Sequence, residues 1–216
     1  MTDELYFKYQ PRYYHGEISS YEALLRSHID NFNVEAFVYS IKCSASFDLN
    51  IILKVLQDRK SLHICDDVSI SLNISIANLL DEKFMHQCLE IFEDEKNITL
   101  ELTNHDQTDD FNGLQKSILL LKNKGVKFAL DDYGKGYLNT DNFLYLDVDY
   151  IKLDRKLIRN INTNYITYSV LKAKYDHIIN VLGKVVIIEG IETFEQFNLV
   201  KEFGARLLFF KANSDY

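Results

Sequence analysis

Short runs of aliphatic and β-branched residues alternate with helix-like segments along the chain, and this alternation restricts the fold more than any other feature. Eight of these runs are predicted to be strands, at residues 5–10, 20–25, 68–75, 97–102, 127–131, 150–154, 184–189 and 206–210. Strands that alternate with helices are typical of a mostly parallel sheet with helices outside it. Eight strands favour a TIM-like α/β barrel over an open doubly wound sheet.

Helices are predicted between the strands, at residues 84–93, 114–122, 143–146, 170–182 and 194–203. A short turn around His15 and Gly16 joins the first two strands, so we expect an antiparallel first strand. Only residues 211–216 follow the last strand, and the barrel is therefore expected to be truncated at its C-terminal helix. Residues 207–210 would then form an apolar edge that favours self-association, such as a homodimer, or a protein partner.

Composition narrows the class of protein. With 216 residues and a single proline, residues 1–216 are expected to form one domain. The 24 Lys and Arg against 32 Asp and Glu give a formal charge of −8, which argues against a nucleic-acid polymer as partner. No apolar run approaches the ~20 residues of a membrane span, and the polar N-terminus lacks a signal peptide, so we expect a cytoplasmic protein.

Polar residues stand at the end of nearly every predicted strand, where parallel barrels carry their chemistry. They are Glu22, Asn73, Glu101, Asp131 with Asp132, Lys152 with Asp154, and Glu189 with Glu192. A structural barrel has no reason to gather carboxylates, because they repel one another and raise one another's pKa values. A hard cation relieves this repulsion, and oxygen ligands without His or Cys pairs suit Mg²⁺ or Mn²⁺.

The adjacent pair Asp131 and Asp132 could hold two ions, one carboxylate bridging both and the other holding the second. Two ions stabilise the attacking and the leaving oxygen of a phosphoryl displacement, and Lys152 fits as a cation beside the phosphate or the water. Each residue alone has a simpler explanation, as a helix N-cap, a surface charge or a solvated lysine. Their number in register favours a metal-supported site for an anionic ligand.

Two other motifs partly match patterns for phosphate or metal binding. Gly134-Lys135-Gly136 lacks the spacing of a phosphate-binding loop, so Gly134 and Gly136 are predicted to belong to a flexible loop that closes over the site. His105 precedes an aspartate, as in His-Asp phosphohydrolases, but the neighbouring helices supply no further histidines in register. A loop histidine is the better interpretation.

The same residues carry a family resemblance. Residues 21–26, Tyr-Glu-Ala-Leu-Leu-Arg, resemble the signature of the EAL family of bacterial cyclic di-GMP phosphodiesterases. Similar motifs follow in the family's order at residues 71–75, 101–103, 129–137, 149–154 and 189–193, and residues 9–11 resemble its opening strand. Ordered motifs from residue 9 to residue 193 are far more specific than one three-letter match.

The resemblance implies hydrolysis of cyclic di-GMP to linear pGpG with Mg²⁺ or Mn²⁺. Ca²⁺ is expected to inhibit, because its looser coordination places the attacking water poorly. The resemblance also implies a first ion held by Glu22, Asn73, Glu101 and Asp131, and a second held by Asp131, Asp132 and Glu189. Lys152 and Glu189 would orient or deprotonate the attacking water. The residues implied to contact the dinucleotide are Gln10, Arg26, Asp154 and Glu192.

The chain also departs from the family pattern. Asn104 stands where a glutamate usually steadies the mobile loop, and residues 207–210 read Leu-Leu-Phe-Phe where the family has Gln-Gly-Tyr. Two hypotheses therefore stay open. One is an active phosphodiesterase, and the other is a catalytically weak or inactive EAL-like module that binds cyclic di-GMP or a protein partner.

Overall fold

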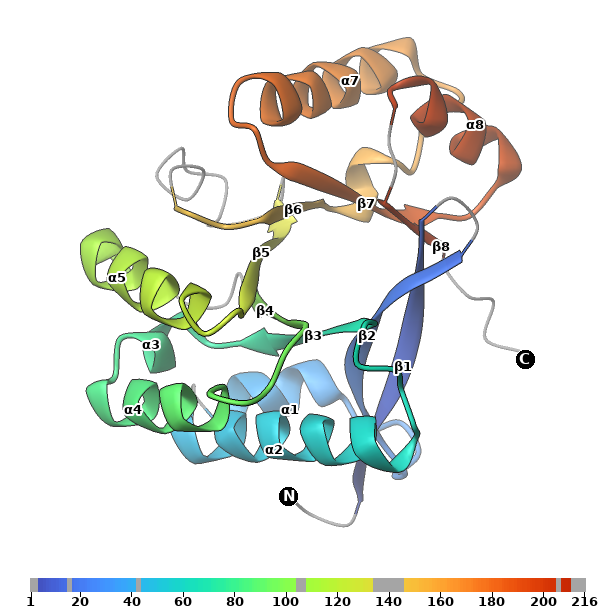
Figure 1. The fold of residues 1–216 in the computed structure, drawn as a ribbon. Coiled ribbons are helices and arrows are strands. Elements are labelled where there is room, and N and C mark those ends of the chain that lie inside the picture. The colour runs from blue at the N-terminus through green and yellow to red at the C-terminus, as the bar shows by residue number, and fades with distance from the viewer. Residues whose placement is uncertain are drawn as a thin grey trace.

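The computed structural model describes residues 4–14, 17–41, 44–103, 108–133, 146–204 and 207–210, with the backbone alone at 14 and 207–210. Eight strands form a closed barrel in chain order (Figure 1). They are β1 (Leu5–Tyr14), β2 (Glu17–Ser27), β3 (Ser69–Ile74), β4 (Ile98–Leu102), β5 (Lys127–Tyr133), β6 (Tyr150–Leu153), β7 (Val185–Ile191) and β8 (Leu207–Phe210). The predicted TIM-like fold with all eight strands is confirmed.

The strand directions agree with the prediction of an antiparallel first strand. From β2 to β8 each strand runs parallel to the next, whereas β1 is antiparallel to both of its neighbours, β2 and β8. Pairing of Tyr13 with Leu208 and of Tyr14 with Leu207 closes the sheet. The sheet itself is complete, because β8 is paired on both sides. The expected truncation at the C-terminal helix concerns residues 211–216, which lie outside the described residues. At residues 207–210 the structure describes the backbone alone.

Helices lie around the outside of the barrel (Figure 1). They are α1 (Val34–Ser40), α2 (Ala45–Ser61), α3 (Ile76–Leu79), α4 (Glu82–Ile91), α5 (Phe111–Lys122), the 3-10 helix η2 (Arg155–Leu157), α7 (Tyr165–Asn180) and α8 (Phe194–Glu202). The prediction found α4, α5, α7 and α8 but missed α1, α2 and α3. The helix predicted at 143–146 falls on undescribed residues except for Leu146, which is not helical.

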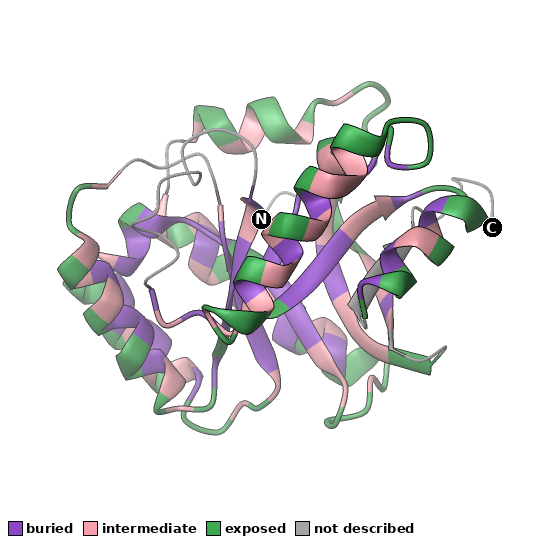
Figure 2. Cartoon of the chain, turned by 90° about the horizontal axis from the view of Figure 1, so that it is seen from above, coloured by how far each residue is buried: buried purple, intermediate pink, exposed green. Residues whose placement is uncertain are grey.

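The apolar core lies between the strands and the surrounding helices. Strand residues such as Ile70, Leu100 and Phe128 are fully buried, and α2 contributes Ile52 and Val55. Figure 2 shows buried residues along the strands and exposed residues on the outer helix faces. Since successive strand side chains point to opposite faces, the other half of each strand faces the barrel interior.

Buried polar side chains fasten α2 to the barrel. Asp48 accepts hydrogen bonds from the Ser75 backbone N at 3.1 Å and from Asn78 Nδ2 at 2.7 Å. At the other end of the helix, the buried guanidinium of Arg59 donates to the carbonyl oxygens of Lys96 at 2.6 Å and Val68 at 2.9 Å.

Within the part of the chain that the structure describes, no helix is both long and apolar enough to cross a membrane.

Candidate metal-supported active site

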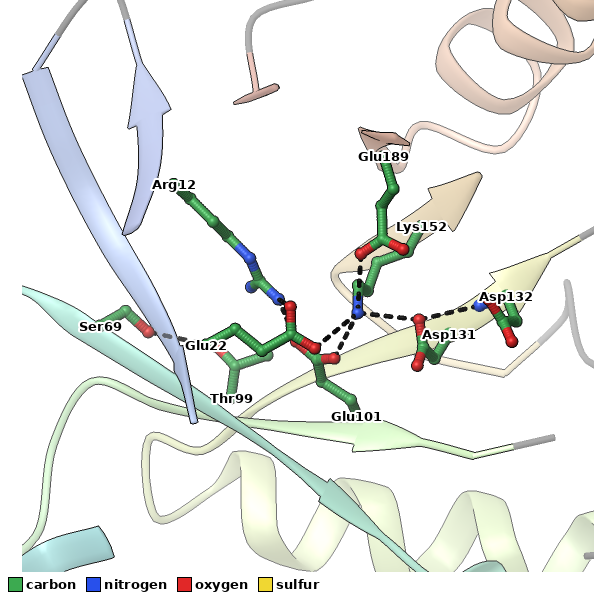
Figure 3. Close-up of polar contacts among 9 residues, drawn as sticks. All are labelled: Arg12, Glu22, Ser69, Thr99, Glu101, Asp131, Asp132, Lys152 and Glu189. Carbon is green, nitrogen blue, oxygen red and sulfur yellow. Dashed lines mark hydrogen bonds and ion pairs between the residues drawn. The ribbon is translucent and has the colours of Figure 1, made fainter. Parts of the chain in front are cut away.

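The ammonium group of Lys152 is the centre of the polar barrel interior (Figure 3). Lys152 lies on β6 and is only 1% exposed. Its Nζ lies 3.3 Å from Glu22 Oε1 and 2.5 Å from Glu101 Oε2. On the other side, the same nitrogen lies 2.8 Å from Asp131 Oδ1 and 2.9 Å from Glu189 Oε1. Carboxylates from β2, β4, β5 and β7 thus converge on one cation.

A second cation, Arg12, enters this cluster from β1 and was not predicted. Arg12 is 3% exposed; its Nη2 lies 3.3 Å from Glu22 Oε2 and makes a short ion pair with Glu101 Oε1. The sequence held one usable signal. Gln10 was assigned to the site, and residues two apart on a strand share a face, so Arg12 had to face the same interior.

Local breaks in the sheet position the acidic residues of β5 and β7. The register of β5 against β6 shifts between Leu130 and Tyr133, and within this bulge Asp132 has a φ of 53°. A regular strand would send Asp131 and Asp132 to opposite faces. The left-handed conformation at Asp132 breaks that alternation and brings both carboxylates to one side, as bulges often do beside active sites.

Glu189 lies within a second bulge of the same kind. The register of β7 against β8 shifts between Ile188 and Ile191, and Gly190 has a φ of 74°. A Cβ atom on Gly190 would lie 2.3 Å from Arg155 Cβ, so both the backbone conformation and the close approach of η2 require glycine here.

Asp131, Asp132 and Glu189 form a group suited to a metal ion. One ligand atom from each lies within 4.8 Å of the others, and all three residues are partly exposed. The side chains of Asp131 and Glu189 are 19% and 21% exposed, against 0% for Glu101. A set of carboxylate oxygens fits Mg²⁺ or Mn²⁺, as the sequence predicts.

The pKa values of Glu101 and its neighbour Glu22 are shifted in opposite directions. Burial raises the pKa of Glu101, but Arg12 and Lys152 outweigh burial and hold that pKa well below its ordinary value. For Glu22, burial and the negative charge of Glu101 outweigh the same two cations, and the pKa is raised. Although burial opposes its charge, Lys152 has a raised pKa because the carboxylates around it stabilise the ammonium form.

The pKa values of the carboxyl groups on β5 and β7 are raised. Burial raises the pKa of Asp131, with Lys152 only partly offsetting it. For Glu189, burial again exceeds the attraction of Lys152, and repulsion from Asp131 adds to it, so that the pKa rises to about 8. Raised carboxyl pKa values are typical of sites that hold a cation or move a proton.

The remaining predicted metal ligands lie near this centre. Glu22 is not at a strand end as predicted, because β2 runs on to Ser27; it lies mid-strand, facing Gln10 in the β1–β2 register. Antiparallel pairing with β1 lengthened β2 beyond its predicted end. Asn73 is paired with Glu101 in the β3–β4 register and is exposed.

The predicted ligand contacts occupy several positions. Arg26 is exposed, and with Asn73 it lines a largely apolar cavity of about 590 Å³ between α1, α2 and the strands β2 and β3. Asp154 is buried and caps η2 by accepting a hydrogen bond from Lys156 N at 2.8 Å. Glu192 is exposed at the start of the turn into α8. Gly134, Gly136, Asn104 and His105 lie outside the described residues.

The fold and the site together define a TIM-like barrel with an interior carboxylate cluster suited to a hard divalent ion. The sequence model of the EAL domain family matches residues 1–209, and the chain belongs to this family. A curated relative, the cyclic di-GMP phosphodiesterase PdeA of Borreliella burgdorferi, is 33% identical over 78 residues. That match covers 36% of this chain and only 12% of PdeA.

Solved structures share the fold. An EAL domain protein from Listeria monocytogenes superposes with a TM-score of 0.83 at 19% identity, covering 96% of this chain and 86% of that one. The BlrP1 protein of Klebsiella pneumoniae, in a complex with calcium and cyclic di-GMP, has a TM-score of 0.80 at 22% identity, covering 96% of this chain and 54% of BlrP1.

Proposed function

We propose that this protein is a cyclic di-GMP phosphodiesterase that opens the cyclic dinucleotide to linear pGpG with Mg²⁺ or Mn²⁺. The observation that carries the proposal is the convergence of four carboxylates on Lys152 beside the Asp131–Asp132–Glu189 group, inside a barrel of the EAL family. A cytoplasmic location belongs to the same proposal. So does assembly as a homodimer or with a protein partner.

The acidic residues would hold the metal. The sequence-predicted ligands are Glu22, Asn73, Glu101, Asp131, Asp132 and Glu189, of which the last three have ligand oxygens within 4.8 Å of one another. When bound, a divalent ion supplies positive charge to the phosphoryl oxygens and lowers the pKa of a coordinated water. Ca²⁺ should bind and inhibit, because its looser coordination positions the water poorly.

Lys152 and Glu189 would carry the proton and charge chemistry. Hydrolysis joins a water oxygen to phosphorus and breaks the bond to a ribose 3′ oxygen, which leaves with a proton. Glu189, whose carboxylate lies 2.9 Å from Lys152 Nζ within the metal-compatible group, would accept the water's proton in its ionised form. Lys152, kept charged by its carboxylate partners, would stabilise negative charge on the phosphate and fix the orientation of Glu189.

Binding of the dinucleotide would use residues around the barrel mouth. Gln10, Arg26, Asp154 and Glu192 are the proposed contacts, with Gly134 and Gly136 in a closing loop. Asp154 is the least accessible of these, because its side chain is buried and already caps η2.

Incubation of the purified protein with cyclic di-GMP and Mg²⁺ or Mn²⁺, followed by chromatography, tests the proposal. We expect pGpG in the presence of either metal, none in EDTA, and little with Ca²⁺. Asp131→Asn should abolish product formation, whereas Asp94→Asn, at an exposed position after α4, should not change it. Equal activity of the two variants would contradict the assignment of Asp131.

One observation favours a second candidate, an EAL-like module that binds cyclic di-GMP or a protein partner without hydrolysis. Arg12 occupies oxygens of Glu22 and Glu101, two of the predicted metal ligands. Binding of cyclic di-GMP without pGpG at any Mg²⁺ or Mn²⁺ concentration would favour this module.

A further inference from the structure

Every carboxylate oxygen of Glu22 and Glu101 faces a cationic nitrogen of the protein itself. Glu22 Oε2 lies 3.3 Å from Arg12 Nη2, and Glu22 Oε1 lies 3.3 Å from Lys152 Nζ. Glu101 repeats the arrangement, with Oε1 paired to Arg12 and Oε2 lying 2.5 Å from Lys152 Nζ. Figure 3 shows both glutamates between these two cations. Both oxygens of each glutamate are thus paired with cations of the protein itself.

The opposite side of the same cluster is built differently. Asp131 and Glu189 each contact Lys152 through one oxygen, and neither contacts Arg12 in the ion pairs of the described residues. Together with Asp132 they form the metal-compatible group, which contains neither Glu22 nor Glu101. The cluster thus has two halves. Glu22 and Glu101 are paired with cations of the protein, whereas Asp131, Asp132 and Glu189 are arranged to receive a metal ion.

We propose that Arg12 takes the place of the first of the two predicted metal ions, so that this protein binds one divalent ion, at Asp131, Asp132 and Glu189. The proposal concerns the metal site of the proposed function and rests on it only for the expectation that the site takes a divalent ion. Arg12 is thereby a fixed internal cation that sets the metal stoichiometry.

Charge supports this assignment. The five carboxylates Glu22, Glu101, Asp131, Asp132 and Glu189 and the two cations carry a formal charge of −3 when all are ionised. One divalent ion leaves this interior slightly negative, whereas two would make it positive before any anionic ligand arrives. Without Arg12 the formal charge would be −4, which two divalent ions neutralise.

Burial makes displacement of Arg12 unfavourable. A second ion at Glu22 and Glu101 would have to remove the guanidinium from both partners while it stays among buried groups. An ion pair buried this deeply is costly to break, because the charge left behind is neither paired nor hydrated. The guanidinium is also permanently charged and cannot be neutralised by losing a proton.

Counting bound Mn²⁺ tests the proposal directly. Isothermal titration calorimetry, with free Mn²⁺ followed by electron paramagnetic resonance, should give one tight ion per chain for the wild-type protein. Arg12→Met, which keeps an unbranched side chain without charge, should bind two, with the second lost again in the double variant Arg12→Met/Glu101→Gln. Two tight ions in the wild type, or an unchanged count of one in a folded Arg12→Met protein, would overturn the proposal.

Arg59→Met is the matched control, because it also removes a buried arginine but one bonded to backbone carbonyls away from the site. It should leave the Mn²⁺ count at one. If Arg12→Met does not fold, Glu22→Gln decides the question in a chain that retains Arg12. Binding of the single ion within about threefold of wild type supports the proposal, and loss of one ion contradicts it.

The Mn²⁺ count does not depend on hydrolysis, so the two proposals can fail separately. One bound Mn²⁺ without any pGpG leaves the role of Arg12 standing and removes the phosphodiesterase proposal. Formation of pGpG by a wild-type protein with two bound Mn²⁺ ions does the reverse.

Discussion

The two halves of the barrel interior use the same residue type in different ways. On the side of β2 and β4, Glu22 and Glu101 lie in regularly paired stretches, with Arg12 and Lys152 as their partners. On the side of β5 and β7, Asp131 and Glu189 lie at bulges, are partly exposed and share Lys152 as their cation within the described residues. A carboxylate inside a barrel therefore becomes structural or available according to its partners and its backbone.

The backbone contributes as much as the charges. Asp132 and Gly190, both with positive φ, lie next to Asp131 and Glu189. Positive φ at a non-glycine residue such as Asp132 costs free energy and persists where the surrounding structure imposes it. The available half of the site is thus the strained half, and the internally neutralised half is the regular one.

The largest expected effect comes from removing the residue that both halves share. Lys152→Met leaves Glu22, Glu101, Asp131 and Glu189 without their common cation. We expect pGpG formation to fall by at least about 10²–10³-fold, the usual loss for one positioned electrostatic contact. Chromatographic rates and thermal unfolding in EDTA and in Mg²⁺ measure this, and Mg²⁺ should recover more stability in the variant than in the wild type.

Lys122→Met serves as the control for this variant. Lys122 also bridges two carboxylates, Asp147 and Asp149, but it does so away from the site. Its loss should leave hydrolysis unchanged. If both lysine variants lose activity equally, Lys152 has no special role.

A smaller effect is expected from disturbing only the bulged half. Gly190→Ala places a methyl group against Arg155 and forces alanine into positive φ, which should displace Glu189. Loss of orientation around a metal ligand typically costs about 10–100-fold in affinity, and we expect a Mn²⁺ affinity reduced within that range. Calorimetric titration measures it.

Gly183→Ala separates clash from backbone strain. Gly183 also has positive φ, at 66°, but no atom lies within 4 Å of the position of an added Cβ. This variant should lose about 1–2 kcal/mol of unfolding free energy from the left-handed conformation and keep its Mn²⁺ affinity. Equal losses of affinity in both variants would mean that the contact between Gly190 and Arg155 is irrelevant.

The smallest effect is a pH dependence of stability. Glu189 has a pKa of about 8 in the folded protein, so between its ordinary value and 8 the folded state binds more protons than the unfolded state. The free energy of unfolding in EDTA should therefore fall as pH rises through this window. Each kcal/mol corresponds to about 2–4 °C in Tm for a domain of this size.

Thermal unfolding at pH 6 and pH 8 measures this effect. In EDTA the Tm should be lower at pH 8, and Mg²⁺ should raise it more at pH 8 than at pH 6, because metal binding requires the ionised carboxylate. Glu189→Gln should flatten the pH dependence in EDTA. A wild-type Tm that rises from pH 6 to pH 8 in EDTA would contradict the prediction for Glu189.

The strands and most of the candidate site could be predicted from the sequence. Strands buried on one face leave a strong aliphatic signal, and polar residues at their ends, such as Asp131 and Lys152, interrupt that signal visibly. The missed helix α2 has a physical reason. Its buried face includes Asp48 and Arg59, so the apolar stripe is broken by charges that find partners only in the tertiary structure.

Arg12 and the bulges were harder to predict. An arginine in a strand is ordinarily placed on the solvent side. Arg12 becomes an interior residue through its ion pairs with Glu22, its neighbour in the β1–β2 hairpin, and with Glu101, which lies far along the chain. The bulge at Asp132 depends on the pairing of β5 with β6, which local sequence does not specify. Non-local partners thus decided what periodicity could not.

The antiparallel first strand has a consequence for the order in which the protein assembles. The hairpin of β1 and β2 contains both Arg12 and Glu22, so this ion pair joins neighbours in sequence and can form early. Pairing of β1 with β8, by contrast, joins segments from opposite ends of the described chain. Contacts between such distant segments carry the highest loop-closure entropy and form slowly. During synthesis the barrel would therefore stay open, with its interior charges hydrated, until β8 has been synthesised and pairs with β1 of the hairpin.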